Sequence, residues 1–466
     1  MNELLFFGSL FCHLVYLFVV MSRTFLRTLK TTTMTLSHRP KIVPNKYFAQ
    51  SNGKDVWTLT NDSAAAAANN AQNKGREMLN LGQGFFSYSP PEFAIKEAKD
   101  ALDIALVNQY SPTRGRPSLI NSLIEFYKPI YNVDLKPANV SVFTGANEAI
   151  LSCLTGLLNQ GDEVIVFEPF FDQYIPNIEM VGGKVVYVPI NPPKALDERV
   201  TKGTEWEIDW DILEKSINSK TKAVILNTPH NPIGKVFTRE ELQRLGDLCV
   251  KHNIIIISDE VYEHLYFTDS FTRIATLSPE IGQLTLSVGS AGKSFAATGW
   301  RIGWIVSLNE ELLGYAAKAH TRICFSSPSP LQEAVANGLT DAGKINYFPN
   351  MREQYIRKYE IFTKVFDELG LPYTAAEGSY FMLANFAKVK IPADYKYPEE
   401  LLSKGKDFRI SYWLMNELGV VAIPPTEFYI KEHEKAAENL LRFALCKDDE
   451  YLEKTVERLR LLKNYL

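Results

Sequence analysis

Four consecutive isoleucines, Ile254–Ile257, are followed at once by Ser258 and Asp259. An unbroken apolar run of this length is typical of a strand that is buried on both faces at the centre of a parallel sheet. Asp259 would then stand at the carboxyl end of the strand, the edge at which open α/β sheets bind their ligands. The run therefore predicts a buried sheet with a carboxylate at its functional edge.

The segments on either side repeat the order of strand, turn and helix. Residues 140–143, 164–167 and 223–227 are predicted to be strands, and residues 239–251 a helix that leads back to the isoleucine run. This alternation implies right-handed crossover connections and, with them, a doubly wound, mostly parallel sheet. The fold class is therefore α/β.

The chain is expected to have four parts. Residues 1–40 form a targeting segment, 41–80 an N-terminal arm that joins the smaller domain, and 81–340 the large sheet domain. Residues 341–466, where charged helices dominate and strands are short, form a second, smaller α/β domain. Within the arm, a helix is expected that Asp62 or Ser63 caps, ahead of a run of alanines.

The first forty residues combine two patterns. Leu4–Val20 is mostly apolar and would suit a short membrane anchor, but no basic residue precedes it and no secretory cleavage pattern follows. Residues 21–33 are basic, rich in hydroxyl groups and free of acids, which is typical of a mitochondrial presequence. We therefore expect a mitochondrial or cytoplasmic protein with no stable membrane span, and with Met21 and Met34 as alternative starts.

Composition excludes several classes of partner. With a net charge of -4 and a pI near 6.1, the chain offers no electrostatic basis for binding nucleic acid. Its five cysteines are odd in number and widely spaced, and its histidines form no metal-binding motif. We expect a reducing compartment, no disulfide framework and no metal site.

A second candidate for chemistry is Lys293, which follows a glycine turn after the predicted strand 284–289. Ser290 lies three residues before the lysine and Arg301 eight residues after it. A lysine among groups that can hold a phosphate suits pyridoxal 5'-phosphate, an aldehyde and phosphate in one molecule that lysine carries as a Schiff base. A solvated lysine in a plain strand-to-loop connection would give the same local pattern, so both interpretations stay open on this segment.

Two strand ends supply residues that would complete such a site. Asp259, at the end of a buried strand, could keep the ring nitrogen of the cofactor protonated by charge pairing. Asn231, in a loop stiffened by two prolines and a glycine, and Tyr262 could bond the ring hydroxyl. Lys293 itself must be neutral to attack, which a dry site near Arg301 would favour.

Each of the other candidate site residues also has a purely structural interpretation. Ala146 and Asn147 open a helix after a glycine turn and could bind phosphate through free N–H groups. Phe171 could stack on a planar ring or simply pack in the core. The loops at Gly84 and Tyr110 could approach a ligand or be ordinary turns.

Taken together, three motifs resemble the class I and II aminotransferases of the aspartate aminotransferase fold. They are NTPHNPIGK at 227–235, SDEVY at 258–262 and GSAGKSFAATGWRIGW at 289–304. The motifs LGQGF at 81–85 and EPFFD at 168–172 narrow the resemblance to the kynurenine aminotransferase and glutamine transaminase K branch, fungal type. The resemblance runs from about residue 41 to the C-terminus.

The resemblance implies a fold of the pyridoxal-phosphate-dependent transferase type and a role for each candidate. Lys293 would be the Schiff-base and proton-shuttle residue, Asp259 the partner of the ring nitrogen, and Tyr262 a contact of the ring hydroxyl. The remaining cofactor contacts would be Asn231, Phe171, Ala146, Asn147, Ser290 and Arg301, with Tyr110 arriving from the other subunit, while Gly84, Asn231 and Arg442 would hold the substrate carboxylate and Trp57 would line the side-chain pocket.

The expected protein is a homodimeric aminotransferase with shared active sites. Kynurenine is the expected amino donor and a 2-oxo acid such as 2-oxoglutarate the acceptor, giving kynurenic acid. Two alternatives remain: a cysteine-S-conjugate β-lyase or glutamine transaminase K activity, and a cofactor-binding regulator without catalysis. Candidate walls of the donor pocket are Trp57, Phe85, Phe86, Tyr88 and Tyr110; the segment 85–88 departs from the pattern of the branch, which leaves substrate preference open.

Overall fold

The structure is a computed structural model that describes residues 43, 45, 47–49 and 54–466. The chain divides into two units, residues 1–51 and 52–466, and the second unit holds every element discussed below. The predicted targeting segment, residues 1–40, lies outside the described residues. Within the described ranges, no helix is both long and apolar enough to cross a membrane.

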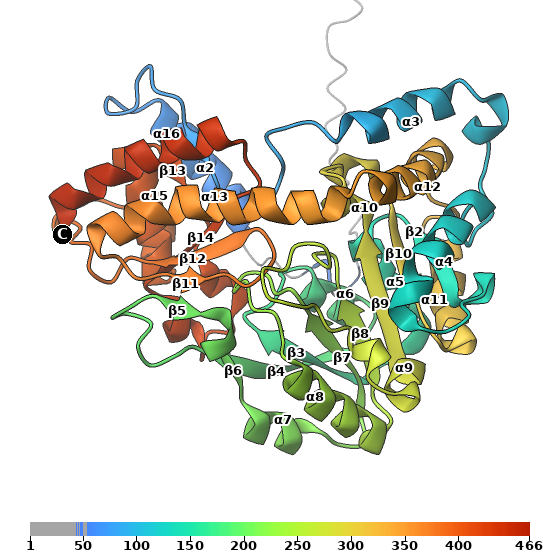
Figure 1. Cartoon of the computed structure of the whole chain (residues 1–466). Coiled ribbons are helices and arrows are strands. Elements are labelled where there is room, and N and C mark those ends of the chain that lie inside the picture. Colours follow the sequence, from blue (N-terminus) through green and yellow to red (C-terminus); the bar gives the residue numbers. More distant parts are fainter. Residues whose placement is uncertain (1–42, 44, 46, 50–53) are drawn as a thin grey trace, which may run out of the picture. The chain divides into compact units, whose positions relative to one another are not determined.

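The large sheet has eight strands in the order β2-β10-β9-β8-β7-β3-β4-β6 (Figure 1). From β9 through β8, β7 and β3 to β4 neighbouring strands run parallel, whereas β10 is antiparallel to β9 and β2, and β6 is antiparallel to β4. The strands are β2 (Val140–Phe143), β3 (Glu163–Glu168), β4 (Lys184–Asn191), β6 (Glu207–Ile208), β7 (Thr221–Asn227), β8 (Ile255–Asp259), β9 (Thr285–Ser290) and β10 (Gly303–Val306). The prediction of a doubly wound, mostly parallel sheet is confirmed.

The isoleucine run forms β8, and its side chains alternate between two helical layers. Ile255 and Ile257 belong to the cluster beneath helices α5, α6 and α11, whereas Ile256 belongs to the cluster beneath α7, α8 and α9. All three side chains are buried, as expected for a strand covered on both faces. The helices are α5 (Ala146–Leu157), α6 (Tyr174–Met180), α7 (Trp210–Ser216), α8 (Arg239–His252), α9 (Pro279–Leu284) and α11 (Glu310–Ile323).

A further group of helices covers the β2–β10 end of the sheet. Trp304 of β10 lies at 0% exposure in a cluster that draws on α4 and α12, and its indole N–H donates to Tyr127 Oη of α4 at 2.8 Å. Helix α3 packs along α12. These helices are α3 (Glu92–Leu102), α4 (Pro117–Tyr131) and α12 (Ser329–Lys344), and the short α10 (Ala291–Ser294) follows β9 directly.

The C-terminal part has its own apolar cluster, built on small sheets and the long helix α13, orange in Figure 1. Strand β12 pairs antiparallel with β14, β1 pairs parallel with β13, and β11 pairs parallel with β5. The elements are β1 (Leu79–Asn80), β5 (Thr201–Lys202), β11 (Thr374–Ala375), β12 (Phe381–Asn385), β13 (Val420–Val421), β14 (Leu440–Ala444), α13 (Tyr347–Leu369), α14 (Glu399–Leu402), α15 (Lys406–Leu418) and α16 (Asp449–Leu459).

Helix α2 (Val56–Ala68) of the N-terminal arm packs on α15, so the arm is attached to the C-terminal part of the chain. The expected cap at Asp62 or Ser63 was wrong, because both residues lie inside the helix. The helix begins at Val56, and Asp55 is its N-cap, because the Asp55 carboxylate accepts from the backbone N–H of Thr58 at 2.6 Å. Val56 and Leu59 bury the extra turn against Phe408 and neighbouring apolar groups, and this tertiary contact outweighs the local capping signal.

The loop that follows β8 is held by a buried ionic cluster. The Arg273 guanidinium donates to the carboxylates of Glu260 and Glu263, and all three side chains are buried. Tyr127 Oη donates to Glu263 Oε1 at 2.7 Å and Ser258 Oγ to Glu260 Oε1 at 2.8 Å. Buried carboxylates need such partners. Through Glu260 and Glu263, Arg273 therefore holds the backbone directly after Asp259 in place.

Replacing Arg273 by methionine should therefore destabilise the protein strongly, since it leaves two buried carboxylates without their cation. Loss of one partner of a buried ion pair costs about 3–5 kcal/mol. Urea denaturation followed by circular dichroism measures the change. Lys96→Met, which removes an exposed ion pair with Asp100, is the control and should leave the midpoint unchanged. An Arg273→Met protein as stable as that control would contradict the assignment.

Candidate active site

A cavity of about 330 Å³ opens at the carboxyl edge of the parallel strands. Every residue predicted to bind the cofactor or the substrate lines it except Tyr110; the further wall candidates are considered below. The structure therefore brings together side chains from both ends of the chain, Trp57 and Arg442 among them, around the end of β8. The predicted members of the lining are Trp57, Gly84, Ala146, Asn147, Phe171, Asn231, Asp259, Tyr262, Ser290, Lys293, Arg301 and Arg442.

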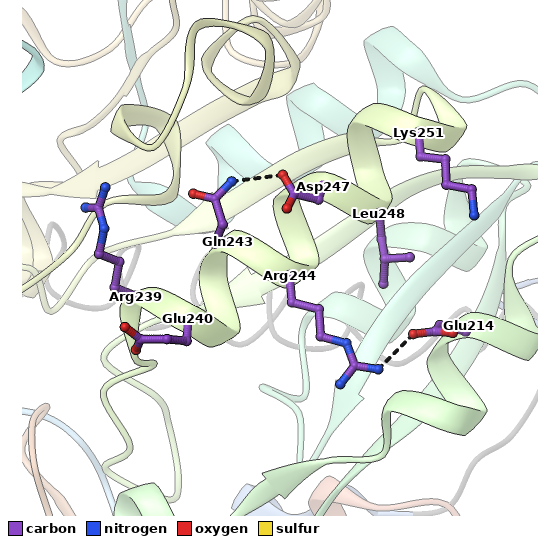
Figure 2. A pocket seen from close by; sticks show the side chains of 8 residues that line it. All are labelled: Glu214, Arg239, Glu240, Gln243, Arg244, Asp247, Leu248 and Lys251. Atoms are coloured by element: carbon purple, nitrogen blue, oxygen red, sulfur yellow. Dashed lines mark hydrogen bonds and ion pairs between the residues drawn. The ribbon is translucent and has the colours of Figure 1, made fainter.

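A larger hollow, of about 560 Å³, lies along the outer side of α8 and α7, but it has the character of a solvated helix face (Figure 2). Its side chains carry charges of both signs and bond one another: Arg244 Nη2 donates to Glu214 Oε1 and Gln243 Nε2 to Asp247 Oδ1, each at 2.8 Å. No side chain in this row is buried, so the smaller cavity is the stronger candidate.

Asp259 closes the floor of the cavity and is 5% exposed. Tyr174 Oη donates to its Oδ2, and the backbone N–H of Val261 lies 3.4 Å from its Oδ1. Burial raises the pKa of Asp259, while the Tyr174 hydroxyl and the Lys293 amine act in the opposite direction. A cationic group placed against this carboxylate would relieve the cost of its burial.

Arg442, on β14, enters the cavity from the C-terminal part and is 1% exposed. Its Nη1 donates to Asn231 Oδ1 at 3.0 Å and its Nη2 to the Gly82 carbonyl at 3.1 Å, while Nε has no hydrogen-bond partner. Burial lowers the pKa of Arg442 to about 10. Among the residues that the structure describes, no carboxylate forms an ion pair with this guanidinium, so it is prepared for an anionic ligand.

The opposite end of the cavity has the features of a phosphate site. Helix α5 begins at Ala146, so its first N–H groups have no partner within the helix. The preceding Gly145 has φ +85°, and a Cβ there would lie 2.5 Å from Arg301 Nη2, so only glycine lets the guanidinium come this close to the helix. Ser290 lines the same cavity.

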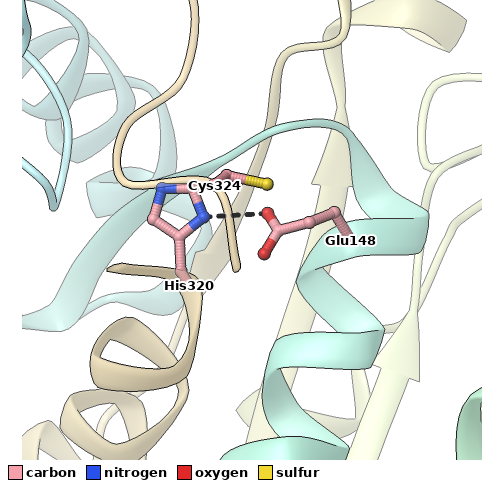
Figure 3. Close-up of side chains that lie close together, drawn as sticks. All are labelled: Glu148, His320 and Cys324. Atoms are coloured by element: carbon pink, nitrogen blue, oxygen red, sulfur yellow. Dashed lines mark hydrogen bonds and ion pairs between the residues drawn. The ribbon is translucent and has the colours of Figure 1, made fainter. Parts of the chain in front are cut away.

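Helix α5 is tied to α11 by a group of three side chains that a metal ion could in principle use (Figure 3). The ligand atoms of Glu148, His320 and Cys324 lie within 4.8 Å of one another, with His320 Nδ1 2.9 Å from Glu148 Oε2. The Glu148 carboxylate also accepts from the Thr144 backbone N–H and from Ser152 Oγ. Since both of its oxygens already have donors, we interpret the group as a tie that orients the start of α5.

Lys293, on α10, points into the cavity between these two ends. Its Nζ donates to Tyr380 Oη at 2.7 Å, and Tyr380 Oη donates to the Gly84 carbonyl at 3.0 Å. Desolvation lowers the pKa of Lys293 to about 8, so the neutral amine is accessible near neutral pH.

Several residues that line the cavity were not predicted, Tyr174, Tyr380 and Phe381 among them, and three predicted wall residues of the segment 85–88 lie elsewhere. Tyr174 and Tyr380 come from α6 and from the turn before β12, and no local motif marks either one. Phe85, Phe86 and Tyr88 do not line the cavity; Phe85 packs under the Lys447 amine, Phe86 on the edge of Tyr380, and Tyr88 Oη bonds Tyr355 Oη. Of the expected walls, Trp57 alone faces the cavity, with its indole N–H on Asp172 at 2.7 Å.

Comparison with known proteins agrees with this geometry. Residues 76–459 match the family Aminotransferase class I and II, and the chain belongs to that family. Its sequence is 76% identical over 446 residues to the Saccharomyces cerevisiae protein named "Probable kynurenine--oxoglutarate transaminase BNA3", covering 96% of this chain and 100% of that one.

A further relative and two solved structures are also named as transaminases or aminotransferases. The human kynurenine--oxoglutarate transaminase 1 is 33% identical over 397 residues, covering 83% of this chain and 93% of that one. The crystal structure of Bna3p from Saccharomyces cerevisiae is 78% identical and superposes with a TM-score of 0.90 over 92% of this chain and 100% of that one. A Thermus thermophilus aspartate aminotransferase, 26% identical, gives 0.76 over 90% and 100%. The expected fold, that of aspartate aminotransferase, is confirmed.

The lowered pKa of Lys293 can be tested by acetylation with acetic anhydride in the purified chain freed of any cofactor. Labelling should rise with pH about a midpoint near 8, because below that pH the amine is protonated and unreactive. Lys96, whose pKa the Asp100 carboxylate raises, is the control and should still be gaining reactivity at about pH 10. Peptide mass spectrometry follows both. A Lys293 that titrates together with Lys96 would show that its amine is not desolvated.

Proposed function

We propose that this chain is a pyridoxal-phosphate-dependent aminotransferase that takes kynurenine as amino donor and 2-oxoglutarate or a similar 2-oxo acid as acceptor. The observation that carries the proposal is the buried guanidinium of Arg442, free of any ion pair in the described part of the chain, across one cavity from the amine of Lys293. An amino acid needs both groups, one for its carboxylate and one for its α-proton. The names of the relatives at 76% and 33% identity support the donor and the acceptor.

The residues present fit the cofactor. A lysine of lowered pKa, a buried carboxylate without a cation against it and a helix start beside Arg301 match an aldehyde, a ring nitrogen and a phosphate respectively. When bound, pyridoxal phosphate supplies an electron sink that lets the α-proton of an amino acid leave. The residues that would hold it are Lys293, Asp259, Tyr262, Asn231, Phe171, Ser290, Arg301, Ala146 and Asn147.

Different side chains of the chain then carry out proton transfer and substrate binding. At pH 7 an amine with a pKa near 8 is neutral in roughly one molecule in ten, far more often than an ordinary lysine. Lys293 can therefore take a proton from the substrate carbon and return it later. Arg442 orients the substrate by a paired hydrogen bond to its carboxylate, and the Asp259 carboxylate stabilises positive charge at the floor of the cavity.

The lining of the cavity favours an aromatic donor over a dicarboxylic one. Beside Arg442 lie the rings of Trp57 and Phe381, whose centroids are 5.5 and 4.2 Å from its guanidinium carbon. The other arginine of the lining, Arg301, lies at the helix start that suits the phosphate. Within the described residues, this cavity thus offers no second guanidinium for a distal carboxylate.

The value of kcat/KM for kynurenine should exceed that for aspartate by at least about tenfold, which corresponds to about 1.4 kcal/mol of transition-state binding. Steady-state assays with 2-oxoglutarate measure both. Arg442→Met should depress both values alike, because both donors share the α-carboxylate. If aspartate equals kynurenine, the aminotransferase stands and the named donor is wrong; release of pyruvate from cysteine S-conjugates at a higher rate would favour the β-lyase.

We further propose that two copies of the chain share their active sites. Tyr110 is 85% exposed and packs edge-on against Phe325, itself half exposed, beside an open groove formed by residues 108–110 and 324–329. Leu106, just before, is 79% exposed. So much exposed apolar surface at one place supports a contact with a second copy, with Tyr110 reaching the phosphate end of the other cavity.

Sharing can be tested by mixing two inactive variants. Tyr110→Ala and Lys293→Ala should each lose most activity alone, but a heterodimer has one site with neither defect. Mixing them under conditions of subunit exchange should therefore restore activity, measured with kynurenine. Mixed samples that stay inactive although mass spectrometry shows exchange would contradict the shared site.

A further inference from the structure

The amine of Lys293 is hydrogen-bonded within the protein, and the direction of each bond is defined. Nζ lies 2.7 Å from Tyr380 Oη, which in turn lies 3.0 Å from the carbonyl oxygen of Gly84. A tyrosine hydroxyl has one proton, and a carbonyl can only accept, so that proton belongs to the Gly84 bond. The lone pair of Tyr380 is thereby left to accept an N–H of Lys293.

The ring of Tyr380 has no freedom to move this hydroxyl. It is 0% exposed and lies at 25° to the ring of Tyr355, with a centroid separation of 6.3 Å. Tyr262 and Phe86 meet it edge-on at 5.1 and 5.6 Å. Burial also raises the pKa of Tyr380 well above its ordinary value, so the phenol keeps its proton. The acceptor for Lys293 is therefore fixed in place and neutral.

The same contact joins the lysine to the loop that Arg442 bonds. Arg442 Nη2 donates to the Gly82 carbonyl, two residues before the Gly84 carbonyl that Tyr380 uses. A Cβ at position 84 would lie 3.1 Å from Tyr380 Oη, so the loop approaches the hydroxyl closely because it has glycine there. One short loop thus carries acceptors for both the carboxylate-binding arginine and the partner of the amine.

We propose that Tyr380 is the positioning residue of the reaction: it holds the free amine of Lys293 at a fixed place beside the substrate carbon. This inference rests on the proposed function. In the proton transfer the C–H bond breaks, its electron pair stays with the substrate, and the proton forms a new bond to the lone pair of Nζ. The amine can keep its N–H on Tyr380 before and after this step, because the bond to Tyr380 uses a hydrogen and not the lone pair. Without Tyr380 the amine would have to be ordered anew for each transfer.

The variant that isolates this contact is Tyr380→Phe, which keeps the ring and removes the hydroxyl. Its matched control is Tyr355→Phe, which removes a buried hydroxyl from the stacked neighbouring ring; within the described residues that hydroxyl bonds Tyr88 and not Lys293. Both variants should fold and bind pyridoxal phosphate in the wild-type ratio. Tyr380→Phe should lower kcat about tenfold with little change in KM, and should increase the primary isotope effect of an α-deuterated donor in the half-reaction. Tyr355→Phe should leave both within twofold.

A second readout does not depend on turnover. In the full chain freed of cofactor, acetic anhydride should label Lys293 at least about threefold faster in Tyr380→Phe than in Tyr355→Phe, since the amine has lost the oxygen that restrains it and favours its protonated form. Wild-type isotope effects and labelling in a folded Tyr380→Phe protein would overturn the inference. A wild-type chain that binds no cofactor and transaminates no donor would overturn the proposed function instead, and the labelling would still decide whether Tyr380 holds the amine.

Discussion

The site depends on keeping ionisable groups away from water while leaving their charges without full compensation. Asp259 and Arg442 are almost completely buried and Lys293 is partly so, and burial shifts the pKa of each toward its neutral form. Such groups cost stability when they stand alone, so a protein retains them where a ligand completes them. An amino acid carboxylate and a cofactor with a cationic ring and a phosphate would supply the opposite charges that the cavity lacks.

The elements around the cavity are densely packed and many of their buried polar groups have partners, which offsets the free-energy cost of burying the site's ionisable groups. Asp259 ends a strand covered by helices on both faces, and the residues after it are anchored through the ion cluster of Arg273 with Glu260 and Glu263. On the other side of the cavity, the Glu148 carboxylate accepts hydrogen bonds from the Thr144 backbone N–H, just before α5, and from His320 of α11. The side chains of the site thus lie on elements whose own polar atoms are hydrogen-bonded. This holds the side chains of the site in fixed positions.

The amino-acid sequence by itself determined the centre of the fold and most of the cavity. The isoleucine run predicted a doubly covered strand, and residues Ile255–Asp259 form that strand, β8, with Asp259 at its end. Gly292 and Gly145 each leave room for a close contact, with the Thr298 backbone and with the Arg301 guanidinium, and a glycine in a motif can be recognised in a single sequence. The motifs that carry the family resemblance are contiguous for the same reason, and most of the residues they assign line one cavity.

The tertiary structure alone decided which distant side chains complete the site. Tyr380 meets Lys293 from 87 positions further along the chain, and Tyr174 reaches Asp259 from 85 positions before it. Neither position differs locally from an ordinary buried tyrosine, so only packing could reveal them. The aromatic residues at 85–88 illustrate the converse: their composition suited a pocket wall, but Phe85 lies exposed beneath the Lys447 amine and Tyr88 bonds Tyr355 away from the cavity. Contacts between residues far apart in the sequence depend on how the faces of helices and sheets pack on one another. No single segment of the sequence specifies that packing.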